Sequence, residues 1–407
     1  MNYKEIKCCR ACGSYNLEPV VDLGEHPYSG YFPSHNSPLE KGPLALTLCE
    51  NCSLVQLTVD YELSEMYGEN YGYRSGLNSS MVKHLESIVA EVINIAEISE
   101  TDLVVDIGSN DGTLLGFYPD NVRKIGIDPS GAKFEKFYKP NIEKHFDFFD
   151  FDTVGELKIR GNCKAITSLS MLYDVPRPTD FVMGIKEALQ PDGLWIFEQS
   201  YLLSMIKANA YDTICHEHLE YYSLTALDNI LKKCGLKITD ARLTGTNGGS
   251  ILIVAAHESS EHKINYDALS RLFREEQTLD VKSPALYNQF FEKINHHRLA
   301  LIETVEGLKR EARPLYLIGA STKGNTLINY SGFTSSDFLC AAEVNEFKFG
   351  KFMPGSAIPI CNERELEFLP DSVGLVLPWH FKDFFIKKPL KNVDLLFPLP
   401  DIKLIRN

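Results

Sequence analysis

The stretch Leu103–Asp128, LVVDIGSNDGTLLGFYPDNVRKIGID, decides the fold of this chain of 407 residues. An apolar run ends at Asp106, a turn that contains Gly108 follows, and the next apolar segment is typical of the start of a helix. A second short strand, KIGID, ends at Asp128. This order of strand, glycine-bearing turn, helix and strand predicts a nucleotide-binding unit. In such a unit glycines let the backbone approach the ligand, and the second acid accepts hydrogen bonds from ribose hydroxyls.

Two ligands compete for this unit. A dinucleotide-binding turn reads G-x-G-x-x-G, because a pyrophosphate lies at the N-terminus of the helix. This chain instead reads D-x-G-x-N-x-G, and Asp111 stands where the phosphates would lie. S-adenosylmethionine carries a sulfonium and an ammonium, so an acidic turn formed by Asp106 and Asp111 favours it over NAD. An ordinary α/β turn without a ligand is the third interpretation.

The residues expected to contact this cofactor follow the strands of one sheet. They are Asp106, Gly108, Ser109, Asn110, Asp111, Asp128, Pro129, Asp147, Phe148 and Ser170. Asp147 and Phe148 stand where an adenine ring is commonly held, although Phe148 and Phe149 also suit a protein core.

The alternation of strands and helices continues after Asp128. We expect a strand at Ala165–Leu169, a helix at Thr179–Leu189 and a strand at Gly193–Glu198. This pattern predicts a doubly wound parallel sheet. Residues 63–95 are expected to be mostly helical, and the segment YGENYGYRSG at 67–76 either packs or forms a lid of phenol donors over a cleft.

Composition excludes several classes of protein. The length suggests two or three domains, and the hydrophobic content of 44% supports well-filled cores. The net charge of −14 argues against nucleic acid or an anionic membrane as a partner. No apolar signal core or membrane span is present, so we expect a cytoplasmic protein. Its ten cysteines are then free thiols or metal ligands.

Four cysteines form two C-x-x-C pairs, Cys9 with Cys12 and Cys49 with Cys52. Two such pairs supply the tetrahedral sulfur set that a structural zinc ion prefers. Because four sulfurs leave no open position, this predicted zinc site is structural rather than catalytic. Redox-active cysteines are the alternative, but no βαβ unit surrounds either pair.

The segment Tyr211–Ser223, YDTICHEHLEYYS, is the chemically densest in the chain. If it is extended, His216 and His218 share a face and Glu217 takes the other. It is either a second metal site, a solvated polar turn or a general-base set. The last of these has an imidazole poised near neutral pH and a carboxylate that orients it. Its place after the last parallel strand, near the ligand-binding edge of the sheet, favours the general base.

The C-terminal third repeats the strand–turn–helix–strand pattern. A glycine-rich turn at 245–250 opens an apolar strand, and residues 266–312 are expected to form connecting amphipathic helices. A strand at Leu315–Gly319 then leads into a turn with Lys323, a helix, and a strand at Cys340–Val344. A turn with a lysine and free backbone N–H groups suits a phosphate, so a nucleotide-linked substrate is predicted. A vestigial fold half without a ligand is the alternative.

These motifs together resemble the bacterial nucleotide-sugar C-methyltransferases, nearly from end to end. The motifs are the two C-x-x-C pairs, YGYRSG, VVDIGSNDGTLL with GIDPS, CHEHLEYYS, NGGS, GASTKGNTL, GKFMPGSAIPI and LPWHF. The resemblance implies an α/β chain of three domains: a zinc-binding module at 1–62, a class I methyltransferase domain at 63–262 and a Rossmann-like domain at 263–407. It also implies a dTDP-4-keto-deoxysugar substrate that is methylated at carbon 3.

The resemblance further implies roles for individual residues. His218 would be the base that forms an enolate beside a ketone, with Glu217 next to it and Tyr71 or Tyr73 as donor to the oxygen. His216 and Tyr222 complete the expected catalytic set. The expected substrate contacts are Arg74, Asn247, Gly248, Ser321, Lys323 and Asn325. We expect a monomer or small homo-oligomer.

Three residues depart from the family pattern. Cys215 stands where a tyrosine is usual, Glu220 where a serine is usual, and Asn247 where a histidine is expected. Glu220 would bind a hydroxyl or amine of a different sugar, or face solvent. These changes leave O-methylation of a nucleotide-linked sugar hydroxyl as the main alternative. A reductase dependent on NAD(P) and a non-enzymatic binding protein are the others. The nucleotide, the sugar and the stereochemistry stay open.

Overall fold

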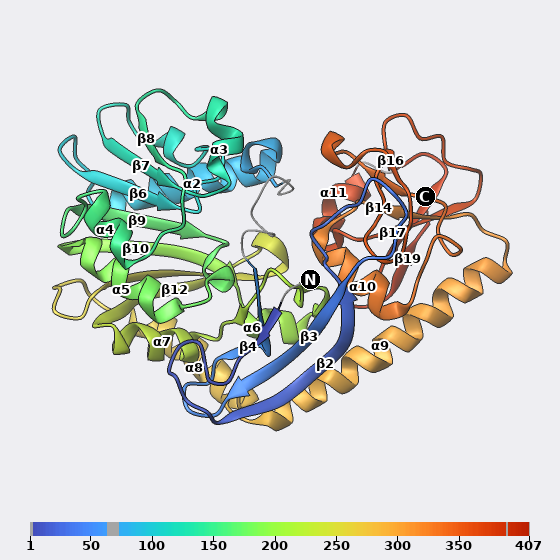
Figure 1. Cartoon of the computed structure of the whole chain (residues 1–407), viewed down its shortest axis with the longest axis horizontal. Helices are drawn as coiled ribbons and strands as arrows, with labels where there is room; N and C mark the ends of the chain where they lie inside the picture. Colours follow the sequence, from blue (N-terminus) through green and yellow to red (C-terminus); the bar gives the residue numbers. More distant parts are fainter. Residues whose placement is uncertain (1–2, 63–72, 388–389, 407) are drawn as a thin grey trace.

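The computed structural model describes residues 3–62, 73–387 and 390–406, and Figure 1 shows two α/β lobes side by side. The predicted fold class is confirmed: a cysteine-bearing N-terminal module, a central class I methyltransferase sheet and a C-terminal Rossmann-like sheet. Among the described residues, no helix has both the length and the apolar character that crossing a membrane would require.

The central sheet has seven strands in the order β12-β13-β10-β9-β6-β7-β8. The strands are β6 (Leu103–Ile107), β7 (Arg123–Ile127), β8 (Ile142–His145), β9 (Cys163–Leu169), β10 (Leu189–Ser200), β12 (Leu236–Thr244) and β13 (Ser250–His257). β13 runs antiparallel to both of its neighbours, while β6 to β10 are parallel. All five residues of β6 are buried, as expected for a central parallel strand covered on both faces. The strand order reverses at β6, which places the ligand-binding edge beyond its end.

Helices cover both faces of this sheet. They are α2 (Ser79–Ile95), α3 (Gly131–Phe134), α4 (Phe151–Glu156), α5 (Pro178–Ala188), α6 (Leu202–Lys207), α7 (Leu224–Lys233) and α8 (Tyr266–Leu279). Within the described part of the predicted helical segment, α2 begins at Ser79, because the Asn78 side chain accepts hydrogen bonds from the N–H groups of Ser80 and Met81 and so caps the first turn. Residues 63–72 lie outside the described part of the chain.

The helix predicted directly after the glycine turn is wrong. Only a 3₁₀ turn, Leu115–Phe117, lies between β6 and β7. Pro119 follows within two residues, and a proline disfavours helical backbone at the residue before it. Leu114 and Leu115 nevertheless pack in the core, so the apolar pattern that indicated a helix reflects burial.

The C-terminal sheet has six strands in the order β16-β15-β14-β17-β18-β19, of which β19 is antiparallel to its neighbour. The strands are β14 (Leu315–Ile318), β15 (Ala341–Glu343), β16 (Ile360–Asn362), β17 (Ser372–Val376), β18 (Val393–Phe397) and β19 (Lys403–Ile405). The helices of this part are α9 (Pro284–Arg310), α10 (Thr322–Ser331) and α11 (Lys382–Lys387). The second strand–turn–helix–strand unit is therefore β14, α10 and β15.

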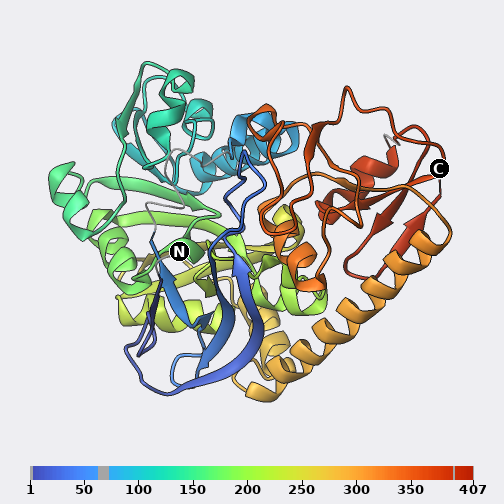
Figure 2. The ribbon, with the colours of Figure 1, turned by 45° about the vertical axis from the view of Figure 1, so that its right-hand side comes forward.

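The N-terminal module reaches both lobes. Its strands are β1 (Tyr3–Glu5), β2 (Leu17–Pro27), β3 (Lys41–Cys49), β4 (Val55–Leu57) and β5 (Val59–Tyr61). β4 also pairs with β11 (Glu220–Tyr221), which directly follows the His-Glu-His segment of the central part. In Figures 1 and 2 the long β2–β3 hairpin lies at the base of the two lobes, where β2 contacts α9 and α10.

The predicted domain boundary between residues 262 and 263 stays a prediction. α8 follows that boundary, yet it packs against α7 and β12 of the central part. The long helix α9 then runs along the C-terminal lobe in Figure 2.

Candidate active site

A cleft of about 1410 Å³ lies between the central part and the C-terminal lobe. Its walls come from the turns after β6, β7 and β9, from the His-Glu-His segment, and from the loop between β14 and α10. A site for one small molecule is typically about 300–1,000 Å³. The cleft therefore has room for a cofactor together with a second ligand.

Nine of the ten predicted cofactor contacts line this cleft. They are Asp106, Gly108, Ser109, Asn110, Asp128, Pro129, Asp147, Phe148 and Ser170. The Asp128 carboxylate is fixed at the end of β7, because the backbone N–H groups of Asn110 and Ser130 each donate to it at 2.7 Å. Gly108 has φ +77, and a Cβ on it would lie 3.0 Å from Met171 Cγ, so this turn requires glycine.

Asp106 lies at the end of β6 with 3% of its surface exposed. Burial raises the pKa of Asp106 to about 7, while the Thr167 hydroxyl, which donates to it at 2.6 Å, lowers it. Asp106 therefore gives the cleft a buried carboxyl whose charge depends on what binds next to it.

The predicted role of Asp111 as a partner for the cofactor's positive charge stays a prediction, and its described contacts are with protein groups. Asp111 does not line the cleft: its carboxylate accepts hydrogen bonds from the Gly76 N–H at 3.0 Å and the Thr113 hydroxyl at 2.6 Å. The Arg74 guanidinium lies 3.6 Å from the same carboxylate and 3.9 Å from the centre of the Phe137 ring. Arg74 lines the cleft, but its charge is paired with Asp111.

The His-Glu-His segment is a turn that separates its two histidines. His218 faces the cleft, and its Nδ1 lies 3.0 Å from the Thr213 carbonyl oxygen. Since a carbonyl can only accept, Nδ1 carries the proton and Nε2 keeps a lone pair. Burial lowers the pKa of His218 to about 3, and the Lys323 charge lowers it further, while the bond to Thr213 raises it. His218 is therefore a neutral imidazole with an acceptor nitrogen.

Two details of the predicted base set are wrong. The group that orients His218 is the Thr213 carbonyl rather than Glu217, and its pKa lies well below neutrality. Glu217 lines the cleft and accepts a hydrogen bond from the Tyr28 hydroxyl at 3.3 Å. Burial raises the pKa of Glu217 to about 7, while Tyr28 and the Lys348 charge lower it.

His216 and Tyr222 lie away from the cleft wall. The Nδ1 of His216 is 2.8 Å from the Ser29 hydroxyl, and its ring lies between Tyr28 and Tyr61 of the N-terminal module. Tyr222 is fully buried in the core of the central part. Both side chains therefore pack rather than face a ligand.

The predicted phenol donors come from the segment before α2. Tyr73 lines the cleft and is 48% exposed, whereas Tyr71 lies outside the described residues.

The three departures from the family pattern occupy different places. Cys215 is fully buried and lines the cleft, as does Asn247, whose amide donates to the Ser170 hydroxyl at 3.2 Å. Glu220 neither faces solvent nor lines the cleft. Glu220 is 1% exposed and its carboxylate lies 3.7 Å from the Arg10 guanidinium, so the alternative that Glu220 faces solvent is wrong.

The C-terminal wall of the cleft includes Ser321 and Lys323 at the start of α10. The Ser321 hydroxyl accepts a hydrogen bond from the Gly324 N–H at 3.0 Å and caps this helix. Asn325 is fully buried and donates to the Ser29 carbonyl at 2.6 Å, and Gly248 packs against Trp379. Neither Asn325 nor Gly248 lines the cleft, so the predicted substrate contacts at these two positions are not found there.

His84, Glu198 and Tyr173 are among the cleft residues that sequence reasoning missed. His84 Nε2 lies 2.6 Å from a Glu198 carboxylate oxygen, and the Tyr173 ring centre is 4.3 Å from that of His218. Glu198 lies at the end of the strand predicted at Gly193–Glu198. Because ligands bind at the carboxyl ends of parallel strands, its position could have identified it as a candidate site residue. His84 and Tyr173 carry no motif.

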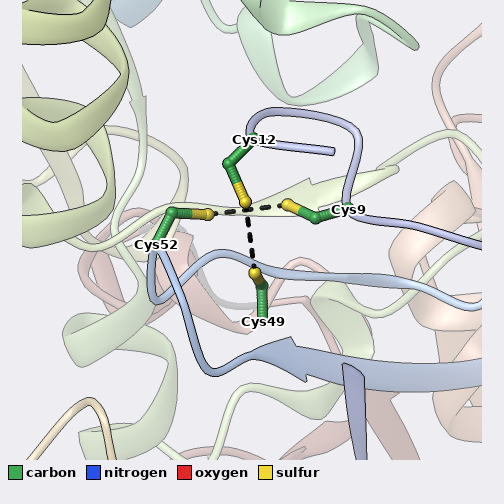
Figure 3. A group of neighbouring side chains, drawn as sticks. All are labelled: Cys9, Cys12, Cys49 and Cys52. Atoms are coloured by element: carbon green, nitrogen blue, oxygen red, sulfur yellow. Dashed lines mark hydrogen bonds between the residues drawn. The ribbon is translucent and has the colours of Figure 1, made fainter. Parts of the chain in front are cut away.

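The four predicted zinc ligands converge in the N-terminal module, as Figure 3 shows. The Sγ atoms of Cys9 and Cys52 are 3.5 Å apart, as are those of Cys12 and Cys49, and all four lie within 4.8 Å of one another. Zinc–sulfur bonds of about 2.3 Å would hold the sulfurs of a tetrahedral site about 3.8 Å apart. The four thiols therefore fit a structural zinc ion.

Three family models match consecutive parts of the chain. The model described as "Putative zinc binding domain" matches residues 9–67, "Methyltransferase domain" matches 81–241, and "C-methyltransferase C-terminal domain" matches 245–400. The C-methyltransferase NovU of Streptomyces niveus is 27% identical over 414 residues, which cover 99% of this chain and 97% of that protein. These matches show a methyltransferase, and together they support a C-methyltransferase family with a zinc-binding N-terminal domain.

Solved structures also resemble this C-methyltransferase. The PH0226 protein from Pyrococcus horikoshii OT3 is 11% identical, and the TM-score is 0.36. The match covers 46% of this chain and 94% of the PH0226 chain. The CurJ carbon methyltransferase is 15% identical, and the TM-score is 0.34. The match covers 46% of this chain and 57% of the CurJ chain.

The C-methyltransferase depends on S-adenosylmethionine, and the cleft residues fit that cofactor. The fixed Asp128 carboxylate would accept hydrogen bonds from ribose hydroxyls, Phe148, which is 42% exposed, would contact adenine, and Gly108 would let the backbone approach the cofactor. When bound, S-adenosylmethionine supplies an electrophilic methyl group.

Proposed function

We propose that this C-methyltransferase methylates the carbon beside the ketone of a nucleotide-linked sugar, with His218 as the general base. The observation that carries the proposal is the place of His218 on the same cleft as the cofactor residues, with Nδ1 held by Thr213 and Nε2 left as an acceptor. A neutral imidazole beside an activated C–H group is the arrangement that enolate formation needs.

The first chemical step is proton abstraction. The C–H bond beside the ketone breaks, its proton goes to Nε2 of His218, and negative charge develops on the ketone oxygen. Lys323 favours this base in its neutral form before the step, because its charge disfavours a second cation nearby. The enolate carbon would then bond to the methyl group as the methyl–sulfur bond breaks, with that bond's electron pair left on the sulfur of S-adenosylhomocysteine. The ketone forms again, and His218 releases its proton to solvent.

The substrate class is supported by the C-terminal wall. Lys323 and the backbone at the N-terminus of α10, a helix of ten residues, meet at the cleft. A helix N-terminus next to a lysine attracts a phosphate. Lys351 and Arg364 add two further cations to the same wall. We infer that a nucleotide diphosphate lies there, with its sugar toward His218.

The test uses a panel of dTDP- and UDP-linked sugars, each in a 4-keto and a 4-hydroxy form. The enzyme is incubated with S-adenosylmethionine, and NMR locates the methyl group in the product. We expect a new carbon–carbon bond beside the ketone and no product from 4-hydroxy sugars. A methyl group on oxygen would contradict the proposal.

A further inference from the structure

Tyr173 is the aromatic neighbour of the proposed base. It lies in a 3₁₀ turn, Leu172–Asp174, that follows β9, and it lines the same cleft. Its ring centre lies 4.3 Å from that of His218, with the planes at 52°. The two side chains therefore meet the same part of any ligand that reaches His218.

The position of Tyr173 is fixed on three sides. The Leu219 N–H, one residue after His218, donates to the Tyr173 carbonyl at 2.8 Å. The phenol is hydrogen-bonded to Ser170, and only 7% of the residue's surface is exposed. A backbone bond, a ring contact and a hydroxyl contact leave the phenol little freedom to turn away from His218.

Cys215, one of the other groups near His218, is a poor hydrogen-bond donor. Cys215, whose carbonyl accepts from the His218 N–H at 3.2 Å, offers a thiol, and S–H is a weak donor. Burial raises the pKa of Tyr173 well above its ordinary value, and the Asp174 charge raises it further, while Ser170 lowers it. Tyr173 therefore keeps its proton and acts as a donor rather than as a base.

We propose that the Tyr173 hydroxyl donates a hydrogen bond to the substrate oxygen that gains negative charge as His218 Nε2 takes the proton. This inference rests on the proposed function. The C–H electron pair becomes the C=C bond, the carbonyl π pair moves to oxygen, and the proton moves to His218. Tyr173 keeps its own proton and lowers the energy of the charged oxygen.

The experiment compares Tyr173→Phe with Tyr221→Phe. The first variant keeps the ring against His218 and removes only the hydroxyl. Tyr221 is a matched control, because it is also a buried phenol of the same region but does not line the cleft. The probe is dTDP-4-keto-6-deoxyglucose in D₂O, and NMR follows loss of the C–H signals beside the ketone. Calorimetry with S-adenosylhomocysteine reports the fold of the cofactor site.

We expect Tyr173→Phe to slow both C–H exchange and kcat by about 10²–10³-fold, the usual cost of removing one donor to a developing oxyanion. Binding of S-adenosylhomocysteine should not change, and Tyr221→Phe should behave like the wild type. Normal exchange in Tyr173→Phe, or an equal loss in both variants, would overturn the inference.

Failure of the proposed function gives a different result. If the wild-type enzyme neither exchanges nor methylates this probe or any other 4-keto sugar of the panel, the proposed function is wrong. If the wild type is active and Tyr173→Phe is equally active, only the role of Tyr173 is wrong.

Discussion

The Arg10 guanidinium lies 3.7 Å from the Glu220 carboxylate, and this pair joins the zinc-binding module to the proposed base. Arg10 is the neighbour of Cys9 in the first C-x-x-C pair, and Glu220 follows His218 by two residues. The same guanidinium donates to the backbone carbonyls of Leu57 at 2.7 Å and Val59 at 2.6 Å. One side chain therefore connects the cysteine cluster, two strands of the module and the strand that follows the His-Glu-His segment.

Replacing Arg10 with methionine should destabilise the protein by about 3–5 kcal/mol, because it removes the donor to the Leu57 and Val59 carbonyls and the cation beside Asp60 and Glu220. Glu220→Gln is the matched control, since it removes the charge and keeps the shape. Urea unfolding of both variants at pH 7 measures the difference. Equal losses in the two variants would show that the Arg10–Glu220 charge pair is not what Arg10 contributes.

Loss of the metal should reduce methyl transfer without reducing cofactor affinity. The N-terminal module contacts the His-Glu-His segment through Tyr28, which donates to Glu217, and through Ser29, which contacts His216. Cys49→Ser should lower the zinc content and kcat together, while calorimetry with S-adenosylhomocysteine stays unchanged.

Cys8→Ser is the control for that experiment, because Cys8 adjoins Cys9 but is not one of the four clustered sulfurs. It should keep one zinc ion per chain and full activity. Full activity in a zinc-free Cys49→Ser protein would contradict a supporting role for the module.

Much of the fold could be predicted because local patterns determine it. The buried strand β6 begins with three apolar residues and carries Asp106 near its end, and Asp128 directly follows the neighbouring strand β7. The two C-x-x-C pairs likewise predicted the sulfur cluster, because each pair fixes its own geometry. Local sequence was sufficient to predict a feature wherever the residues that form it lie within one strand or one motif.

The site was harder to predict because its partners come from distant parts of the chain. Asp111 is acidic in the sequence, but only the structure shows that Arg74 and Gly76 use its charge. Asn325 carries a polar side chain toward Ser29, almost 300 residues away, rather than toward a ligand. Tyr173 lies beside His218 through a backbone bond that no sequence pattern encodes.

His218→Ala should abolish turnover and leave cofactor binding intact. Removal of a general base typically costs about 10²–10⁴-fold in rate. His218 has its Nδ1 at the Thr213 carbonyl and does not contact the Asp128 end of the cleft in the described structure, so the Kd of S-adenosylhomocysteine should not change. The exposed His35→Ala is the control. Normal kcat in His218→Ala would remove the base assignment.

Asp128→Ala should weaken cofactor binding by about 10–100-fold, the effect expected from losing charged hydrogen bonds of about 1.5–3 kcal/mol. The carboxylate also accepts from Asn110 and Ser130, so part of the loss comes from the turn itself. Asp120→Ala, at an exposed position, should bind normally. Calorimetry with S-adenosylhomocysteine measures both, and an unchanged Kd for Asp128→Ala would contradict a ribose-binding role.

The buried His216 should make the protein sensitive to acid. Burial lowers its pKa to about 3, whereas an unfolded histidine titrates near 6.5. Below pH 6.5 the unfolded chain therefore binds a proton that the folded chain excludes. As a result, the free energy of unfolding decreases as the pH is lowered. His216→Gln has no group that binds this proton. The difference in free energy of unfolding between the wild type and this variant should therefore be about 2 kcal/mol smaller at pH 5 than at pH 7. Urea unfolding at both pH values measures the deficit, and a deficit that stays constant or grows would show that His216 is protonated in the folded protein.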